Sequence, residues 1–166
     1  MLGYLREMGF EIASGDEIAR RVFESGPIQS ALAALLGQET PVEPSDLREA
    51  ISRSHATRRA ANRLLHPAIL KALAGEPAQF FEIPLLIETC IQGRFDRVWV
   101  VTCGAEEQLR RLTERLGDET KARRLVDIQL SAPVKTAFAD EIVRTNQSED
   151  AVKANVAAAV TREFGG

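Results

Sequence analysis

Residues 10–21 read FEIASGDEIARR, and this stretch decides the fold class. Its apolar first part predicts a short strand that ends at a serine and a glycine. Asp16 follows as a potential N-cap or first-turn residue of a helix whose apolar face carries Ile18, Val22 and Phe23. A strand, a tight turn and a helix in this order are typical of α/β proteins.

The bulk composition is that of a globular protein. The 166 residues fit a single domain, residues 1–166, with 45% hydrophobic and 27% charged residues. The sequence has neither a membrane-spanning apolar run nor the pattern of a signal peptide, so we expect a cytoplasmic protein with no membrane role. The net charge of −3 argues against a general nucleic-acid surface but leaves room for a local phosphate pocket. The oligomeric state is left open.

Cysteines and histidines give no metal signature. Cys90 and Cys103 lie too far apart for a metal or redox pair and are expected to be buried free thiols. Neither His55 nor His66 has metal-ligand spacing to another suitable side chain, so we expect no metal site built from protein side chains. Taken alone, His66 is expected to be a hydrogen-bonded structural histidine.

Three further segments read as strands. AQFFEIPLL is strongly apolar and is expected to end at Pro84, and RFDRVWVVT, residues 94–102, is a continuously apolar run. A continuously apolar strand favours a parallel sheet covered on both faces. DEIVRTN reads as a last short strand. The sequence therefore predicts an α/β fold with at least three or four parallel strands.

Helices occupy most of the remaining chain. They are expected at residues 2–8 and 28–36, over two segments from Asp46 to about Ala74, and over the terminal segment SEDAVKANVAAAVTREF. Ser45 or Asp46 is available to cap the first of the two middle helices, and Pro67 is expected to kink or restart the second.

Asp16 is the first candidate for chemistry. A carboxylate just past the end of a parallel strand lies at the edge where open α/β sheets bind their ligands. The alternative is a helix N-cap, which the helix dipole favours without any ligand. Arg20, one turn later, could pair with Asp16 or point toward a substrate phosphate.

Residues 105–130 form the second candidate, two charged helices separated by Gly117. Their cations are Arg110, Arg111, Arg115, Lys121, Arg123 and Arg124, and their anions include Glu106, Glu107, Glu114, Asp118 and Glu119. Such a run can be a solvated, salt-bridged surface. It can also be a lid that delivers cations to a transferred phosphoryl group and excludes water.

These segments together resemble the dephospho-CoA kinase family. The resemblance rests on GFEIASGDEIARRV, LLHPAI, EIPLLIE, VWVVTCGAEEQLRRLTER and IQLSAPVKTAFADEIVRTN, in this order. It implies a P-loop-kinase-like parallel sheet sandwiched by helices, a CoA-binding helical insertion at about residues 27–75 and a helical lid at about 105–130. The implied reaction is phosphorylation of the ribose 3′-hydroxyl of dephospho-CoA by ATP with Mg²⁺.

The resemblance also implies roles for individual residues. Asp16 would orient or deprotonate the substrate hydroxyl, and Arg115 would start the lid, with Arg123 and Arg124 further along it. Lys135 and Asn146 would lie on the ATP side, with Asn146 near the adenine. The dephospho-CoA pocket would include Arg20, His66, Pro84, Leu85, Leu86 and Glu88.

The sequence departs from the family pattern at the phosphate-binding loop. No Gly-x-x-x-x-Gly-Lys-[Ser/Thr] motif occurs in the 166 residues, and residue 2 aligns just beyond that loop. Two expectations compete: the start is mis-assigned, or the chain is a shortened, non-catalytic paralogue or subunit that binds CoA-like nucleotides. In either case the first central strand is absent, and the chain as given is expected to be a poor catalyst. Ser14 also replaces the first acidic residue of the family's Asp-Ala-Asp.

Overall fold

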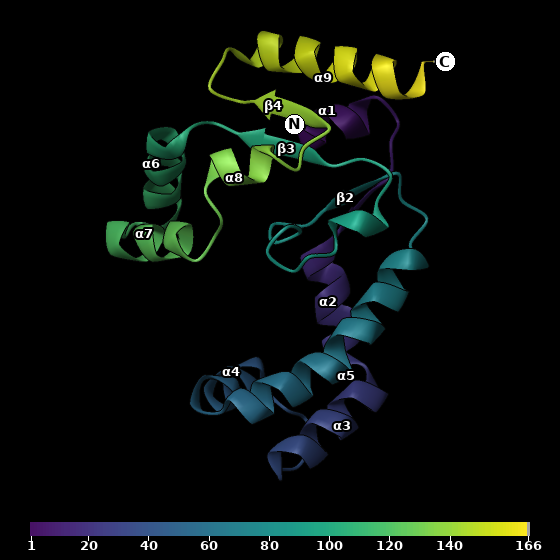
Figure 1. Ribbon diagram of the computed structural model, residues 1–166, viewed down its shortest axis with the longest axis vertical. Helices are drawn as coiled ribbons and strands as arrows, with labels where there is room; N and C mark the ends of the chain where they lie inside the picture. The colour runs from purple at the N-terminus through teal and green to yellow at the C-terminus, as the bar shows by residue number, and fades with distance from the viewer. Residues whose placement is uncertain (166) are drawn as a thin grey trace. The chain divides into compact units, whose positions relative to one another are not determined.

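The computed structural model describes residues 1–165 (Figure 1). Its elements in chain order are α1 (Leu2–Glu7), β1 (Ile12–Ser14), α2 (Gly15–Glu24), α3 (Gly26–Leu36), α4 (Pro44–Arg53), α5 (His55–Ala74), β2 (Phe80–Glu82), the 3₁₀ turn η1 (Gln92–Arg94), β3 (Trp99–Thr102), α6 (Ala105–Leu116), α7 (Glu119–Asp127), α8 (Ala132–Thr136), β4 (Glu141–Arg144) and α9 (Glu149–Phe164). The chain divides into two compact units. The middle unit is Phe10–Ile83, and the terminal unit combines residues 1–9 with those from 84 onward.

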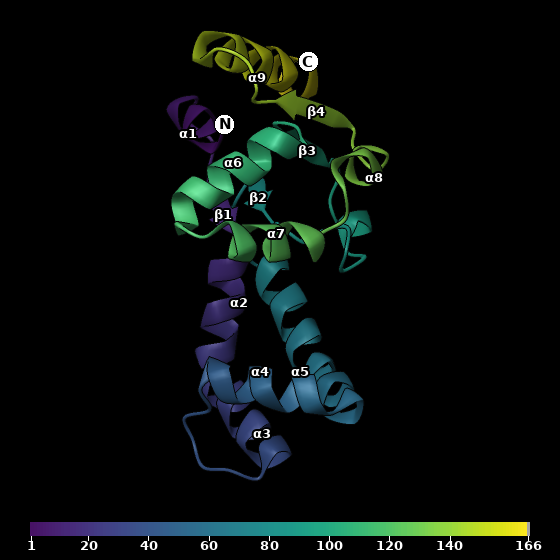
Figure 2. The ribbon, with the colours of Figure 1, turned by 90° about the vertical axis from the view of Figure 1, so that its left-hand side faces the viewer.

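The middle unit is built on a parallel pair of strands, β1 and β2. Ile12 lies opposite Phe80 and Ser14 opposite Glu82. Helices α2 to α5 form the connection between the two strands, as a parallel pair requires. Helices α2 and α5 run side by side (Figure 2). A cluster of Ala13, Ile18 and Leu73 joins these helices to the sheet.

Helices α3 and α4 pack against α5 in the same unit. Leu32, Val42 and Leu47 are at the centre of their shared core. Neither residue expected to cap α4 does so, because the helix begins at Pro44, before both of them, with Glu43 at the N-cap and no side-chain cap bond. Helix α5 runs without a break through Pro67, so the expected restart is wrong. Packing against three helices compensates for the one hydrogen bond that Pro67 removes.

The terminal unit contains the second parallel pair, β3 and β4, with Trp99 opposite Glu141 and Thr102 opposite Arg144. Helix α9 packs on β4, and α1 packs on α9 (Figure 1). Leu5 and Val156 are fully buried in this packing. Helix α8 contacts β3.

The expected fold class is confirmed as α/β with parallel strands flanked by helices. Within residues 1–165 the four strands pair as two two-stranded sheets, so each strand has one edge without a strand partner. Val101 is 45% exposed, so β3 is not covered on both faces by the described residues. An apolar run shows that a segment is a strand, whereas long-range contacts determine its neighbours.

Two further expectations meet the structure. Cys90 and Cys103 are free, but Cys90 is exposed and Cys103 only partly buried, so the expected burial is wrong. Both thiols follow the ends of apolar segments and therefore lie outside the cores that those segments form. No helix within residues 1–165 has the length and apolar character needed to cross a membrane.

Candidate active site

The turn from β1 into α2 positions Asp16. A Cβ atom on Gly15 would lie 2.9 Å from Cγ1 of Ile83 and 3.1 Å from the carbonyl oxygen of Glu82. Only glycine therefore lets α2 start this close to the end of β2. The next residue, Asp16, is placed at the carboxyl end of β1, where parallel sheets bind ligands.

Asp16 does not cap its helix. The hydroxyl of Ser14 is the N-cap and accepts a hydrogen bond from the backbone N–H of Glu17 at 3.4 Å. The capping interpretation of Asp16 is therefore wrong, because the residue that replaces the family's first acidic residue already fills this role. The carboxylate of Asp16 is exposed and forms no hydrogen bond or ion pair with any residue from 1 to 165.

Arg20 lies one turn along α2 and is also exposed without a described partner. The i, i+4 pair with Asp16 that the sequence allowed does not form within residues 1–165. It is Arg21 that is paired, with its Nη2 atom 2.6 Å from Oε2 of Glu76. Arg20 lines a hollow of about 270 Å³ beside β1, together with residues 76–78. The carboxylate of Asp16 and the guanidinium of Arg20, on the first two turns of α2, are thus unpaired within the described residues.

His66 lies on α5 and is exposed, with no hydrogen bond to the rest of residues 1–165. The expectation of a hydrogen-bonded structural histidine is therefore wrong, because this position of α5 faces away from the packed helices. No hydrogen bond joins His66 to Asp16 or Arg20 in the described chain.

In the terminal unit, the structure brings three predicted residues together. The Nζ atom of Lys135 lies 3.0 Å from Oε1 of Glu88 and 3.4 Å from the carbonyl oxygen of Pro84. The backbone N–H of Leu130 also donates to Glu88, at 2.9 Å. Both charged side chains are more than four-fifths buried. Segment 84–88 and helix α8 are therefore joined by a sheltered ion pair.

The environment of Glu88 favours its charged form. Burial alone would raise the pKa of this carboxyl group, but hydrogen bonds from Leu130 and Lys135 outweigh burial and lower the pKa. The second oxygen, Oε2, is buried without a hydrogen-bond partner among the described residues. Leu85 is 40% exposed, whereas Leu86 packs on the core of Ile87 and Val98.

Helices α6 and α7 form the predicted charged hairpin. Gly117 ends α6 in the left-handed conformation, with φ of 65°, and Asp118 caps α7 by accepting from the N–H of Lys121 at 3.0 Å. Arg123 is held 2.6 Å from Glu119. Arg115 and Arg124 are exposed and have no side-chain partner within residues 1–165. The salt-bridged interpretation therefore fits only part of the hairpin.

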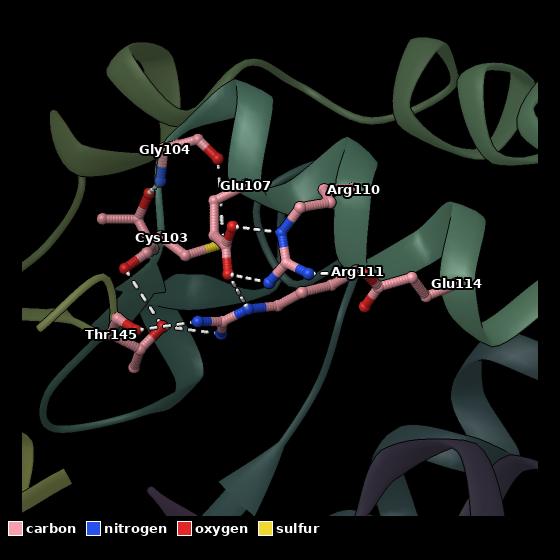
Figure 3. A network of polar contacts seen from close by, with 8 residues as sticks. Cys103, Gly104, Glu107, Arg110, Arg111, Glu114 and Thr145 are labelled. Carbon is pink, nitrogen blue, oxygen red and sulfur yellow. Dashed lines mark hydrogen bonds and ion pairs between the residues drawn. The ribbon is translucent and has the colours of Figure 1, made fainter. Parts of the chain in front are cut away.

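A network at the start of α6 was not assigned from the sequence (Figure 3). Glu107 lies between two arginines, with its Oε1 atom 2.6 Å from Nη2 of Arg110 and 2.7 Å from Nε of Arg111. Hydrogen bonds from Arg110 and Arg111 lower the pKa of Glu107 to about 2. Arg111 also donates from Nη2 to the carbonyl oxygen of Thr145, at 3.0 Å. The i, i+4 spacing of Glu107 and Arg111 was the signal available in the sequence.

Asn146 follows Thr145 and is exposed, and its amide forms no hydrogen bond with residues 1–165. The neighbouring Gln147 accepts a hydrogen bond from Asn155 at 3.1 Å.

The side chains present do not form a magnesium site by themselves. Among residues 1–165 no group of three or more His, Cys, Asp or Glu side chains could hold a metal ion. At the end of β1, the hydroxyl oxygen of Ser14, two residues before Asp16, is engaged in capping α2.

The structure is that of an α/β protein with parallel strands, and exposed charged side chains without described partners lie just past the end of β1 and on the charged hairpin. A family model for dephospho-CoA kinase matches residues 2–151, and this chain belongs to that family. One relative is the dephospho-CoA kinase of Syntrophotalea carbinolica, which is 32% identical over a match that covers 95% of this chain and 82% of that protein. Another is the dephospho-CoA kinase of Mannheimia succiniciproducens, which is 30% identical over 87% of this chain and 72% of that protein.

Solved structures share the fold. TT1252 from Thermus thermophilus has a TM-score of 0.84 at 22% identity, and the match covers 99% of this chain and 90% of that one. Dephospho-CoA kinase from Campylobacter jejuni has a TM-score of 0.66 at 21% identity, with the same coverage.

Proposed function

We propose that this chain carries out the transfer of the γ-phosphoryl group of ATP to the ribose 3′-hydroxyl of dephospho-CoA, which gives CoA and ADP. The single observation that carries the proposal is the state of Asp16. This carboxylate lies at the carboxyl end of a parallel strand, does not cap its helix and pairs with no cation among residues 1–165, so it is available to a ligand. Membership of the dephospho-CoA kinase family supports dephospho-CoA as that ligand.

Asp16 is proposed to accept a hydrogen bond from the 3′-hydroxyl and to take its proton as the new O–P bond forms. General-base assistance of this kind contributes roughly 10²- to 10⁴-fold to a rate. Arg115 is proposed to offset the negative charge on the transferred group, since cations supply much of the catalysis in phosphoryl transfer. Arg124 is the second free cation described on the hairpin, while Arg123 is engaged by Glu119.

Acceptor binding is assigned to residues in each unit separately. In the middle unit we assign it to Arg20 and His66 and to the helical region of about residues 27–75. In the terminal unit we assign it to Pro84, Leu85, Leu86 and Glu88. The exposed Leu85 and the Oε2 atom of Glu88, which has no partner among the described residues, support the second assignment.

Donor binding is assigned to Lys135 and Asn146. The free amide of Asn146 supports its assignment. Lys135 is committed to Glu88, so we propose that it acts on the nucleotide only through the segment that it holds. Mg²⁺ would supply charge neutralisation on the phosphates, but the described side chains do not fit it, and none of the proposed steps depends on it.

A second candidate function is non-catalytic binding of a CoA-type nucleotide. It is supported by the exposed Leu85 and by the Oε2 atom of Glu88, which has no hydrogen-bond partner among the described residues, because binding of the acceptor alone would use these groups without a site for ATP. Incubation with ATP, Mg²⁺ and dephospho-CoA, followed by chromatography of the products, separates the two candidates. CoA formation above a protein-free control supports the kinase. Binding of dephospho-CoA without turnover supports the second candidate.

A further inference from the structure

The network around Glu107 links helix α6 to the turn that follows β4. Arg111 is held from one side by Glu107 and donates from the other to the carbonyl oxygen of Thr145. Its second terminal nitrogen, Nη1, lies 3.5 Å from the hydroxyl of the same threonine. A guanidinium is planar and has several fixed donors, so it can bridge two acceptors in one geometry. Arg111 therefore fixes the position of the Thr145 backbone relative to α6.

The same threonine is anchored to β3. Its backbone N–H donates to the carbonyl oxygen of Thr102 at 2.8 Å, and its hydroxyl lies 3.4 Å from that oxygen. Both polar groups of the Thr145 backbone are thus satisfied, one by β3 and one by α6. The turn lies at the carboxyl ends of two parallel strands, which is where open α/β sheets bind ligands.

The residue that follows this anchor is free to contact a ligand. The amide of Asn146 has one donor group and one acceptor and meets neither need within residues 1–165. An asparagine amide can pair with the N6 and N7 atoms of adenine, whereas guanine offers two acceptors at the corresponding edge. A fixed backbone before Asn146 would hold this amide in one position, where it pairs with adenine better than with guanine.

We propose that Glu107 and Arg111 are positioning residues that hold Thr145, and through it Asn146, so that the Asn146 amide reads the adenine base of the donor nucleotide. This inference rests on the proposed donor-side role of Asn146. Arg110 provides a matched control, because it shares Glu107 and also contacts Glu114 but has no hydrogen bond to Thr145.

The test measures binding of ATP, GTP and dephospho-CoA to the full chain by titration calorimetry. Arg111→Ala is expected to weaken ATP binding and to reduce the preference for ATP over GTP by about tenfold, the discrimination that one amide–base pair provides. Dephospho-CoA binding should not change. Arg111→Lys keeps the charge but cannot bridge both acceptors, so it should lose the same preference. Arg110→Ala should retain it.

Equal effects of Arg110→Ala and Arg111→Ala on the ATP/GTP preference would overturn the inference. Asn146→Ala distinguishes this failure from failure of the proposed function. If Asn146→Ala removes the preference and Arg111→Ala does not, only the positioning role is wrong. If the wild-type chain has no preference, or Asn146→Ala leaves it intact, the donor-side role of Asn146 is wrong and the positioning role with it.

Discussion

The ammonium group of Lys135 lies 3.0 Å from the carboxylate of Glu88, and both side chains are mostly shielded from water. Charge-assisted hydrogen bonds of this kind contribute more than exposed pairs do. The pair joins a residue that precedes β3 to the helix that follows the hairpin, so it organises two segments to which we assign substrate binding.

The first prediction concerns the stability supplied by Glu88. Because its pKa is lowered in the folded protein, its contribution is present above the ordinary pKa of about 4.5 and is lost as the pH falls through the lower folded value. We expect Glu88→Gln to reduce the free energy of unfolding by about 1.5–3 kcal/mol at pH 7, the range for hydrogen bonds to charged groups. Urea titrations at pH 7 and pH 3 should show a smaller difference from wild type at pH 3.

The exposed pair of Glu49 and Arg53 on α4 provides the control. Glu49→Gln should change the unfolding midpoint little at either pH. If Glu49→Gln lowered the stability as much as Glu88→Gln does, burial of the Glu88–Lys135 pair would not be the cause of its contribution to stability.

The second prediction concerns the close approach at Gly15. In Gly15→Ala the new methyl group would press on Ile83 and on the backbone of Glu82. Such overpacking costs about 1–3 kcal/mol. Gly26→Ala is the matched control, because a Cβ at Gly26, also in a first helical turn, meets no described atom within 4 Å. Thermal unfolding should show a lower midpoint for Gly15→Ala only, and equal midpoints would contradict the described packing.

The β1–α2 turn shows which structural features can be predicted from the sequence and which cannot. The strand, the turn, the helix and the position of Asp16 at the strand end were predictable, because hydrophobic periodicity and turn residues are local signals. The identity of the capping residue could not be predicted, because Ser14, Asp16 and Glu17 are all acceptable near a helix start. Only the backbone geometry selects Ser14.

The sequence also did not predict which side chains and which strands pair with one another. The sequence identified the arginine-rich hairpin but not which cations remain free, since Glu119 can reach Arg123 and no described acid reaches Arg115. The division of four parallel strands into two pairs was likewise invisible, because pairing depends on contacts between residues far apart in the chain. The exposure of His66 depends on which face of α5 meets its neighbours.

The third prediction tests Asp16 as a catalytic carboxylate. Asp16→Asn should lower the rate of CoA formation by about 10²- to 10⁴-fold with little change in dephospho-CoA affinity, because the amide cannot accept the proton. Stability should change little, since Asp16 has no described partner to lose. Glu17→Gln, in the same helical turn, should retain activity. Unchanged turnover in Asp16→Asn would remove Asp16 from the reaction.

The fourth prediction separates the free from the paired cations of the hairpin. Arg115→Ala should lower turnover by about 10²- to 10³-fold, the usual effect of removing one group that stabilises transition-state charge. Lys121, whose ammonium lies 3.5 Å from Asp118, is the control, and Lys121→Gln should leave turnover unchanged. Equal turnover in the two variants would favour a purely structural hairpin.

The last prediction applies to both candidate functions, because both include the binding of dephospho-CoA. Titration calorimetry of the wild-type chain with dephospho-CoA, and separately with ATP and Mg²⁺, measures the two affinities most directly. We predict that dephospho-CoA binds more tightly than ATP, because the free groups at the end of β1 and around Glu88 are assigned to the acceptor. Tight binding of ATP with no binding of dephospho-CoA would contradict it.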